Sequence, residues 1–461
     1  MLAQLKPRIA DDILGLIGET PMVRLNSVTK GLAPKVFAKL EMFNPGGSVK
    51  DRVGIAMLTD AERRGVIGPG YTIVEPTSGN TGMGLALAAV LKGYRIIFTV
   101  PDKMSRDKVD LLRAYGARVI VTPSNVPPGH PSSYVKVAER LARETPRAFM
   151  PNQYANPANP RAHYASTGPE IWAQTRGTVD YLVAGAGTGG TISGAGRFLK
   201  EKNPSIRVVA ADPEGSLISS RFYGRKEKVR PYKIEGIGED FMPSTLDLSV
   251  VDRVVTVKDK DAFVMSRRLA KEEGILAGGS SGAAVWAALE VAKELDSTRT
   301  VVVILPDTGR SYLAKIYNDD WMLEYGFIES SEERIAVDDV LRFKSRRIKK
   351  LVSVAPSDTV AKAIGLLKKH DVSHLPVLLK GVPVGELSEN TLASKLARKR
   401  VSSRSRVEDA MDEPLPTVRR GDYMLNPLNV LKDRNAALVV EGTQAVGILT
   451  TIDVINYLAR R

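Results

Sequence analysis

Runs of β-branched and apolar residues alternate with stretches of helical periodicity from Thr20 to about Leu323. The apolar runs predict buried strands, and stretches such as Asn80 to Lys92 and Ser105 to Tyr115 predict helices. Strands that alternate with helices indicate a parallel sheet covered on both faces, so the sequence predicts an α/β fold. Ligands of such folds bind in the loops beyond the carboxyl ends of the strands. The predicted strands are 72–75, 95–100, 117–122, 181–185, 207–212 and 300–306.

The pattern changes after the last of these elements. Residues 328–338 are polar and acidic, which is typical of a linker, and an internal repeat follows. Its two copies, 371–396 and 434–458, each contain an apolar strand, a turn, a second strand and a helix, and each follows a β-α segment. Two such β-α-β-β-α units would pack face to face as one module. The predicted organisation is a first unit over 1–327, a linker over 328–340 and repeats over 341–397 and 403–461.

Composition narrows the functional classes. The 461 residues, 43% of them hydrophobic, suffice for two or three folded units. The chain has no cysteine and only four scattered histidines, so we expect neither disulfides, nor thiolate chemistry, nor a metal site. No run reaches the roughly 20 apolar residues that a membrane span needs. The first residues lack the apolar core of a signal peptide, so the expected location is cytoplasmic.

The net charge of +14 raises the alternative of a nucleic-acid partner. The densest basic runs are 343–350 and 395–406, and neither interleaves aromatic side chains for base stacking among its basic ones. We therefore interpret both runs as solvated connecting segments and expect no nucleic-acid partner.

Two loops of the predicted first unit carry candidate chemistry. In Asn44 to Arg52, Lys50 follows two glycines and precedes a helical stretch, which suits an amine held rigidly in a cleft. A desolvated lysine has a lowered pKa and attacks carbonyl groups, whereas a surface lysine at a helix start is the plainer interpretation. The second loop, Glu75 to Gly82, joins a strand to a helix, and its hydroxyls and amides suit a carboxylate better than an ordinary N-cap turn requires.

A third loop, Gly185 to Thr191, follows a predicted strand and matches G-x-G-x-x-G, with Asp212 at the end of the next strand. That is the dinucleotide fingerprint, so NAD binding is a rival interpretation. Glycines let backbone amides close around any phosphate, however, so the match indicates a phosphate before it indicates a nucleotide. A lysine nucleophile, a carboxylate loop and a phosphate loop together suit an aldehyde-phosphate cofactor acting on an amino acid.

With Gly278 to Gly282, these loops resemble those of the fold-type II pyridoxal-phosphate enzymes, the cysteine synthase and cystathionine β-synthase family, from about Ile13 to Tyr325. The resemblance implies two parallel-sheet subdomains around pyridoxal 5'-phosphate. It implies that Lys50 holds the cofactor aldehyde, Asn80 the ring hydroxyl and Ser280 the ring nitrogen. The residues implied for the phosphate are Gly187, Thr188, Gly189, Gly190 and Thr191, and those implied for the substrate are Thr77, Ser78, Thr81, Gln153 and Tyr154.

Within that family, 235–241 and 130–134 are more similar to cystathionine β-synthase than to cysteine synthase. The implied reaction is a β-replacement through an aminoacrylate intermediate, in which L-serine or an activated serine condenses with L-homocysteine to give cystathionine. The nearest alternative is an O-acetylserine or O-phosphoserine sulfhydrylase that makes cysteine from sulfide. The chain begins without the haem-binding extension of the animal enzymes and has no cysteine, so no haem is expected. A homodimer or higher homo-oligomer follows from the resemblance alone.

The repeat resembles the paired regulatory domains, or Bateman module, of the same family. In the second copy, Thr450 and Asp453 are spaced to meet a ribose or phosphate, whereas the first copy offers Ser388 and Thr391 with no acidic residue. We therefore expect one site for S-adenosylmethionine or an adenine nucleotide. A ligand-free packing or dimerisation module is the alternative, and a catalytically idle adenosyl-sensing regulator is a further one that an intact Lys50 argues against.

Overall fold

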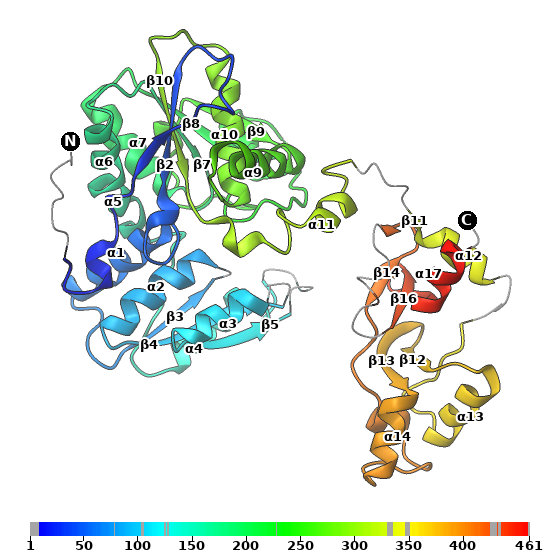
Figure 1. Ribbon diagram of the computed structural model, residues 1–461. Helices are drawn as coiled ribbons and strands as arrows, with labels where there is room; N and C mark the ends of the chain where they lie inside the picture. The colour runs from blue at the N-terminus through cyan, green and yellow to red at the C-terminus, as the bar shows by residue number, and fades with distance from the viewer. Residues whose placement is uncertain are drawn as a thin grey trace. The chain divides into compact units, whose positions relative to one another are not determined.

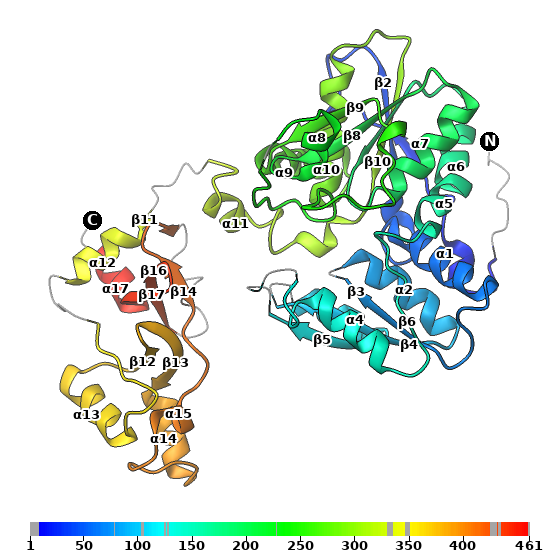
Figure 2. The ribbon, with the colours of Figure 1, turned by 180° about the vertical axis from the view of Figure 1, so that it is seen from behind.

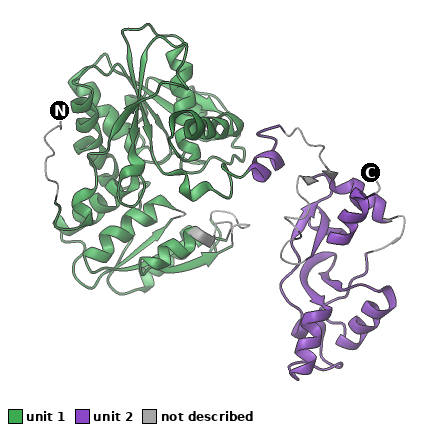
Figure 3. Cartoon of the chain, viewed as in Figure 1, with its two compact units in different colours: residues 1–318 green, residues 319–461 purple. Residues whose placement is uncertain are grey.

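The structure is a computed structural model, drawn in Figure 1 and from behind in Figure 2. It describes residues 9–77, 79–102, 106–123, 126, 129–226, 228–329, 335–345, 351–424, 431 and 435–459. The chain forms two compact units, Met1–Asn318 and Asp319–Arg461, coloured separately in Figure 3. Within the described ranges, no helix combines the length and the apolar character that crossing a membrane would require.

A six-stranded sheet forms the larger half of the first unit. Its order is β1-β2-β10-β7-β8-β9, and all neighbours are parallel except β1 and β2. Every residue of β10 is buried, as expected of a central strand with helices on both faces. The strands are β1 Met22–Arg24, β2 Lys35–Leu40, β7 Tyr181–Gly185, β8 Arg207–Pro213, β9 Arg253–Val257 and β10 Thr300–Leu305.

Helices cover both faces of this sheet (Figure 1). On one face Leu182, Val208 and Ile304 share a core cluster with residues of α6 and α7. The apolar helix α10 packs against β7, β8, β9 and β10, and α9 packs against α10. The helices are α5 Ala158–Ala165, α6 Thr167–Gln174, α7 Gly190–Lys202, α8 Leu217–Phe222, α9 Asp259–Glu273 and α10 Gly279–Ala292.

A second parallel sheet, of order β5-β4-β3-β6, forms the smaller half of the first unit. Val53, Leu85 and Phe98 belong to the core between this sheet and α1 and α2, and Ala138 of α4 packs with Val74 and Ile97. The expectation of two parallel-sheet subdomains is confirmed. The elements are α1 Lys50–Arg63, β3 Thr72–Pro76, α2 Asn80–Leu91, β4 Arg95–Pro101, α3 Arg106–Ala114, β5 Arg118–Thr122, α4 Tyr134–Glu144 and β6 Ala148–Phe149, with the short 3-10 helices η1 Ile13–Leu16, η2 Glu41–Phe43, η3 Leu248–Val250 and η4 Gly309–Tyr312 elsewhere in the unit.

The second unit contains the two repeats. Antiparallel strands β12 and β13 pair in the first copy, and β16 and β17 pair in the second, where β14 adds in parallel to β16. Each copy has its own apolar core. The elements are α11 Asp319–Glu324, β11 Ile335–Ala336, α12 Val337–Ser345, α13 Val360–His370, β12 His374–Leu379, β13 Val382–Ser388, α14 Glu389–Ala397, α15 Val407–Ala410, β14 Thr417–Arg419, β15 Tyr423–Met424, β16 Ala436–Glu441, β17 Gln444–Thr450 and α17 Thr451–Leu458.

Helix α12 differs from the linker predicted over 328–340. Val337 and Val340 are fully buried in the same cluster as Leu449 and Val454, so α12 belongs to the core of the second copy although it precedes the first in sequence. The reason is the i, i+3, i+4 spacing of Val337, Val340 and Leu341, which gives an otherwise largely charged helix one apolar face.

Candidate active site

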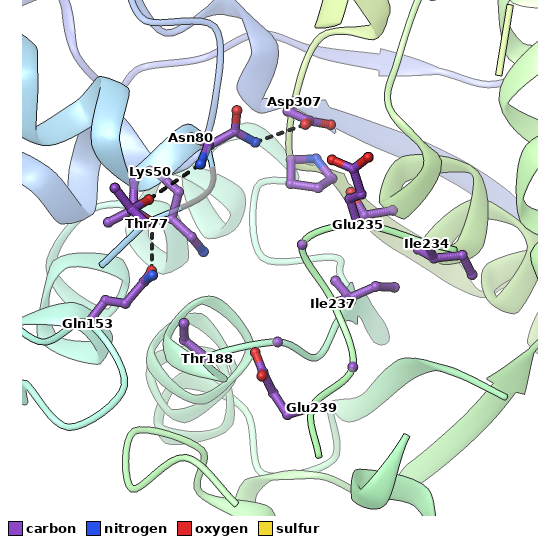
Figure 4. Close-up of a pocket in the computed structure, with 18 of the residues that line it drawn as sticks. Lys50, Thr77, Asn80, Gln153, Thr188, Ile234, Glu235, Ile237, Glu239 and Asp307 are labelled. Carbon is purple, nitrogen blue, oxygen red and sulfur yellow. Dashed lines mark hydrogen bonds between the residues drawn. The ribbon is translucent and has the colours of Figure 1, made fainter. Parts of the chain in front are cut away.

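A cavity of about 830 Å³ opens in the first unit, at loops that follow β3, β7 and β10 (Figure 4). This is the place that an open parallel sheet offers to ligands. Ser78 lies outside the described residues. Gly190 of the phosphate loop does not line the cavity. The other predicted cofactor and substrate residues do: Lys50, Thr77, Asn80, Thr81, Gln153, Tyr154, Gly187, Thr188, Gly189, Thr191 and Ser280.

Lys50 is the first residue of α1, and its side chain points into the cavity (Figure 4). The close crossing of α1 and α2 fixes its position, because a Cβ at Gly84 would lie 2.2 Å from the carbonyl oxygen of Lys50. Burial lowers the pKa of the Lys50 amine, and the nearby carboxylates of Glu239 and Asp307 only partly oppose this. The amine is therefore shifted toward the neutral, nucleophilic form.

The loop between β3 and α2 presents hydroxyl and amide groups to the same cavity. Thr81 donates from Oγ1 to Oε1 of Gln153 at 2.6 Å, and Thr77 Oγ1 accepts from the backbone N–H of Gly82 at 3.2 Å. Asn80 begins α2, and its Nδ2 donates to Asp307 Oδ2 at 2.9 Å. These bonds orient the side chains at a helix N-terminus, where free backbone amides favour an anion.

The loop between β7 and α7 supplies a second helix N-terminus. Gly189 has φ of +81°, and a Cβ at Gly190 would lie 1.9 Å from Asn159 Oδ1, so the turn requires glycine at both positions. Asn159 also donates to Thr188 Oγ1 at 3.0 Å. Thr191 Oγ1 lies 3.2 Å from Nε2 of His163. Burial lowers the pKa of His163 well below its usual value, so a neutral ring braces this loop.

Asp212, the acidic residue on which the dinucleotide interpretation depends, is not available to a ligand in the cavity. Asp212 is fully buried, and its Oδ2 accepts from the backbone N–H of Ser219 at 2.8 Å. It does not line the cavity, so it is not placed for the ribose contact that the fingerprint requires.

Asp307 is a site residue that sequence reasoning missed. It follows β10, is almost fully buried, and its Oδ2 accepts from Tyr312 at 2.7 Å as well as from Asn80. Burial raises the pKa of its carboxyl. A carboxylate directly after an all-buried central strand was the available signal, since such positions lie at the ligand-binding edge of the sheet.

The segment 229–240 forms a further wall of the cavity. Gly238 donates from its backbone to Ala186 at 2.6 Å, and a Cβ at Gly187 would lie 2.5 Å from the carbonyl oxygen of Gly236. Glu235 pairs with Lys108 at 2.5 Å and with Lys315 at 2.6 Å. The segment is thus fastened directly over the loop between β7 and α7.

Comparison with known proteins identifies the family. The model of the family described as pyridoxal-phosphate dependent enzyme matches residues 13–307, and the CBS domain model matches 345–398 and 407–460. The chain belongs to the pyridoxal-phosphate dependent enzymes. It is 40% identical to a cystathionine beta-synthase of Dictyostelium discoideum, over 99% of this chain and 93% of that protein. The proteins of the same name from Oryctolagus cuniculus (42% identity, 99% and 86%) and Saccharomyces cerevisiae (36% identity, 97% and 98%) are similar as well.

Two solved structures in the family resemble the first unit. One is an O-acetylserine dependent cystathionine beta-synthase from Helicobacter pylori, with 39% identity and a TM-score of 0.63 over 68% of this chain and 100% of that chain. The other is a hydrogen sulfide-producing enzyme from Fusobacterium nucleatum, with 38% identity and a TM-score of 0.62 over 66% and 99%.

The cavity has the chemistry that the family's cofactor requires. The helices α2, α7 and α10 all begin at it, and their N-termini favour an anionic group such as a phosphate. Ser280, in the first turn of α10, contributes a buried hydroxyl. A desolvated amine on the facing wall, Lys50, suits an aldehyde. The residues therefore fit pyridoxal phosphate.

In the second unit, Thr450 and Asp453 meet at the start of α17. Asp453 Oδ2 accepts from the backbone N–H of Thr450 at 2.8 Å, from its Oγ1 at 2.6 Å and from Lys344 Nζ at 2.6 Å. In the first copy, Ser388 and Thr391 are bonded through their hydroxyls at 2.8 Å at the start of α14. Both pairs cap a helix, so a capping role alone accounts for the contacts seen.

Proposed function

We propose that the chain catalyses a pyridoxal-phosphate dependent β-replacement that joins L-serine, or an activated serine, to L-homocysteine and gives cystathionine. The observation that carries the proposal is the desolvated amine of Lys50, which faces a cavity on which three helix N-termini converge. The cystathionine beta-synthases of the curated relatives, similar over nearly the whole chain, support this choice of reaction.

Each part of the cavity has a role in holding the cofactor. Lys50 would bind the aldehyde, and the loop from Gly187 to Thr191 would bind the phosphate with its backbone amides. Asn80, oriented by Asp307, would hold the ring hydroxyl, and Ser280 would hold the ring nitrogen. When bound, the cofactor supplies an electron sink that stabilises negative charge at the substrate Cα.

The loop between β3 and α2 binds the substrate. The hydroxyls of Thr77 and Thr81 and the amide of Gln153 receive the amino-acid carboxylate, which also lies at the N-terminus of α2. Tyr154, which follows Gln153 and also lines the cavity, would lie near the leaving group. The lowered pKa of the Lys50 amine suits a general base, so this amine would take the Cα proton of a substrate held at the cofactor.

A sulfhydrylase that uses O-acetylserine and sulfide is the second candidate. One solved relative is named as O-acetylserine dependent, which supports an activated serine as the donor in either reaction, and the other is named as an enzyme that produces hydrogen sulfide. Both reactions require the same amine and the same carboxylate site. Initial rates with serine and homocysteine, set against rates with O-acetylserine and sulfide, separate the two.

Lys50→Ala tests the cofactor assignment in the full-length protein. We expect the variant to lose the visible absorbance of bound pyridoxal phosphate and its turnover, and borohydride to fix the cofactor to residue 50 in the parent only. Lys293→Ala, at a lysine whose side chain is 58% exposed, is the matched control and should behave as the parent does. Full turnover by Lys50→Ala would refute the assignment.

A regulatory ligand, S-adenosylmethionine or an adenine nucleotide, is proposed for the second repeat. The support is the carboxylate of Asp453 beside the hydroxyl of Thr450 at the start of α17. Titration calorimetry on the full-length protein tests it. No heat with either compound would favour the alternative of a ligand-free packing module.

A further inference from the structure

The proposed reaction moves a proton at Cβ as well as at Cα. The β-hydroxyl of serine is a poor leaving group unless it is protonated, and the entering thiol must lose a proton. The amine of Lys50 takes the Cα proton and has to return it when the product forms. A second acid-base group in the cavity would let Lys50 keep that proton until then, and Glu239 lines the cavity with a titratable carboxyl.

Glu239 is held firmly at the cavity wall. Its backbone N–H donates to Ser216 Oγ at 3.1 Å, and its carbonyl oxygen accepts from Leu217 at 2.8 Å. Gly238, one residue before, donates to Ala186 beside the phosphate loop. The carboxyl itself points into the cavity, on the side of Thr188 (Figure 4). A side chain whose backbone is bonded on both sides can be held in a productive geometry.

The surroundings of Glu239 keep its carboxyl partly protonated at neutral pH. Burial and the neighbouring Asp240 raise its pKa to about 7, while Lys50 and a hydrogen bond from Tyr154 act in the opposite direction. A carboxyl in this range can donate a proton and take one back in the same turnover. The charged and titratable groups that face it are Lys50, Tyr134, Tyr154, Asp212, Tyr232 and Asp240.

We propose that Glu239 is the general acid and then the general base at Cβ, an inference that rests on the proposed use of serine. The Glu239 carboxyl gives its proton to the β-hydroxyl as the Cβ–O bond breaks, and water leaves. The resulting carboxylate takes the proton of the thiol as the Cβ–S bond forms, which restores the carboxyl. Serine and thiol thus become thioether and water with no other reactant.

A comparison of two substrates that differ in their leaving group distinguishes an acid-base role of Glu239 from a structural one. Acetate leaves without protonation, whereas hydroxide does not. With serine and homocysteine, kcat/KM of Glu239→Gln should therefore fall about 100-fold or more below that of the parent. With O-acetylserine and homocysteine, the factor by which kcat/KM falls should be at least about 10-fold smaller. Both assays use the same thiol, so the loss of the base affects them alike. The absorbance of bound pyridoxal phosphate shows whether the variant still holds its cofactor.

A pH profile gives an independent result. In the parent, kcat with serine should fall as pH rises through about 7, because the acid form is consumed, and Glu239→Gln should lack that decline. Asp240→Asn is the matched control at an exposed neighbour. At a pH well below the decline it should keep the serine to O-acetylserine ratio of the parent, and it should move the decline to lower pH, since Asp240 helps to raise the pKa of Glu239.

The outcomes are distinct. Equal losses of Glu239→Gln with both substrates, or no loss with serine, would overturn the acid-base role while the proposed function stands. A parent protein that turns over O-acetylserine but not serine with homocysteine would remove the need for this acid and overturn its role, while the β-replacement with an activated serine stands. A parent that turns over neither with homocysteine would overturn the proposed function.

Discussion

Replacing Glu170 with glutamine should destabilise the first unit far more than the loss of an ordinary ion pair. Glu170 accepts from Lys39 at 2.6 Å and from Arg52 at 2.6 Å. The side chain of Lys39 is fully buried and that of Arg52 is 3% exposed, and Glu41 completes a set of two cations and two carboxylates. Glu170→Gln leaves one positive charge without compensation in a place that water does not reach.

The free energy of unfolding that Glu170→Gln loses can be bounded from below and from above. Breaking a buried ion pair by removing one partner costs about 3–5 kcal/mol. Lys39 can also become neutral by losing its proton, which at pH 7 costs about 4.6 kcal/mol for a lysine of ordinary pKa. Burial already lowers the pKa of Lys39, so its deprotonation costs less than this and limits the loss of stability. We therefore expect Glu170→Gln to lose about 3–4 kcal/mol at pH 7.

The same reasoning predicts how the loss depends on pH. At pH 9 the deprotonation of a lysine costs only about 1.9 kcal/mol, so the defect of Glu170→Gln should shrink to about that value. Urea unfolding of the full chain at both pH values, followed by tryptophan fluorescence, measures the difference. Two of the three tryptophans, Trp172 and Trp286, lie in the first unit and report on it.

An exposed ion pair in the same unit provides the control. Arg253 and Glu294 lie 2.8 Å apart with side chains 41% and 59% exposed, so Glu294→Gln should cost at most about 1 kcal/mol at either pH. A loss for Glu170→Gln no larger than that for Glu294→Gln, or one that does not shrink at pH 9, would refute the reasoning.

Three further predictions follow from single contacts. The ion pairs of Glu170 lower the pKa of its carboxyl to about 2, so the stability that it contributes is complete above its ordinary pKa of 4.5 and should be lost as pH falls from there toward 2. After allowance for solvent screening this is about 2 kcal/mol, measured as urea midpoints at pH 5 and pH 3. Gly190→Ala should weaken pyridoxal phosphate binding at least about 10-fold in equilibrium titrations because its Cβ meets Asn159, whereas Gly68→Ala, with nothing within 4 Å, should not. Asp453→Asn should lower the free energy of unfolding of the second unit by about 1–2 kcal/mol in thermal melts, since it breaks a helix cap and a partly buried ion pair, and should abolish any calorimetric signal with S-adenosylmethionine.

The sequence predicted well wherever a local pattern decides the outcome. The run 181–185 is strand β7 without any change of bounds, the loop before Asn80 follows strand β3 as predicted, and Lys50 begins the helix that was predicted to follow its glycines. Periodicity and glycine spacing are local properties, so they survive without knowledge of the tertiary contacts. Helix α12 shows the converse: its first four residues were predicted as linker and the rest as part of the first repeat, whereas its partners are in the second repeat, about a hundred residues away in sequence.

Asp307 and His163 were not predicted as site residues from the sequence, for the same physical reason. Asp307 acts through Asn80, which lies 227 positions earlier in the chain, and His163 acts through Thr191, 28 positions later. The position of Asp307 after a predicted strand marks it as a ligand-edge residue but not as the partner of Asn80, and nothing in the spacing of His163 distinguishes it from an ordinary buried polar side chain. A role that consists of holding another side chain depends on tertiary packing, which one sequence does not display.

The division of the site between the two sheets explains why its residues must be judged together. The smaller half supplies the amine of Lys50 and the carboxylate loop, and the larger half supplies the phosphate loop, Asp307 and Glu239. Neither half alone holds both the amine and the phosphate loop. The hydrogen bond from Asn80 to Asp307 joins the halves at the cavity itself, so it contributes to the placement of the amine relative to the phosphate loop. A substitution that breaks this bond should therefore alter the chemistry of Lys50 without touching it, because the relative placement of the two halves is what makes the amine catalytic.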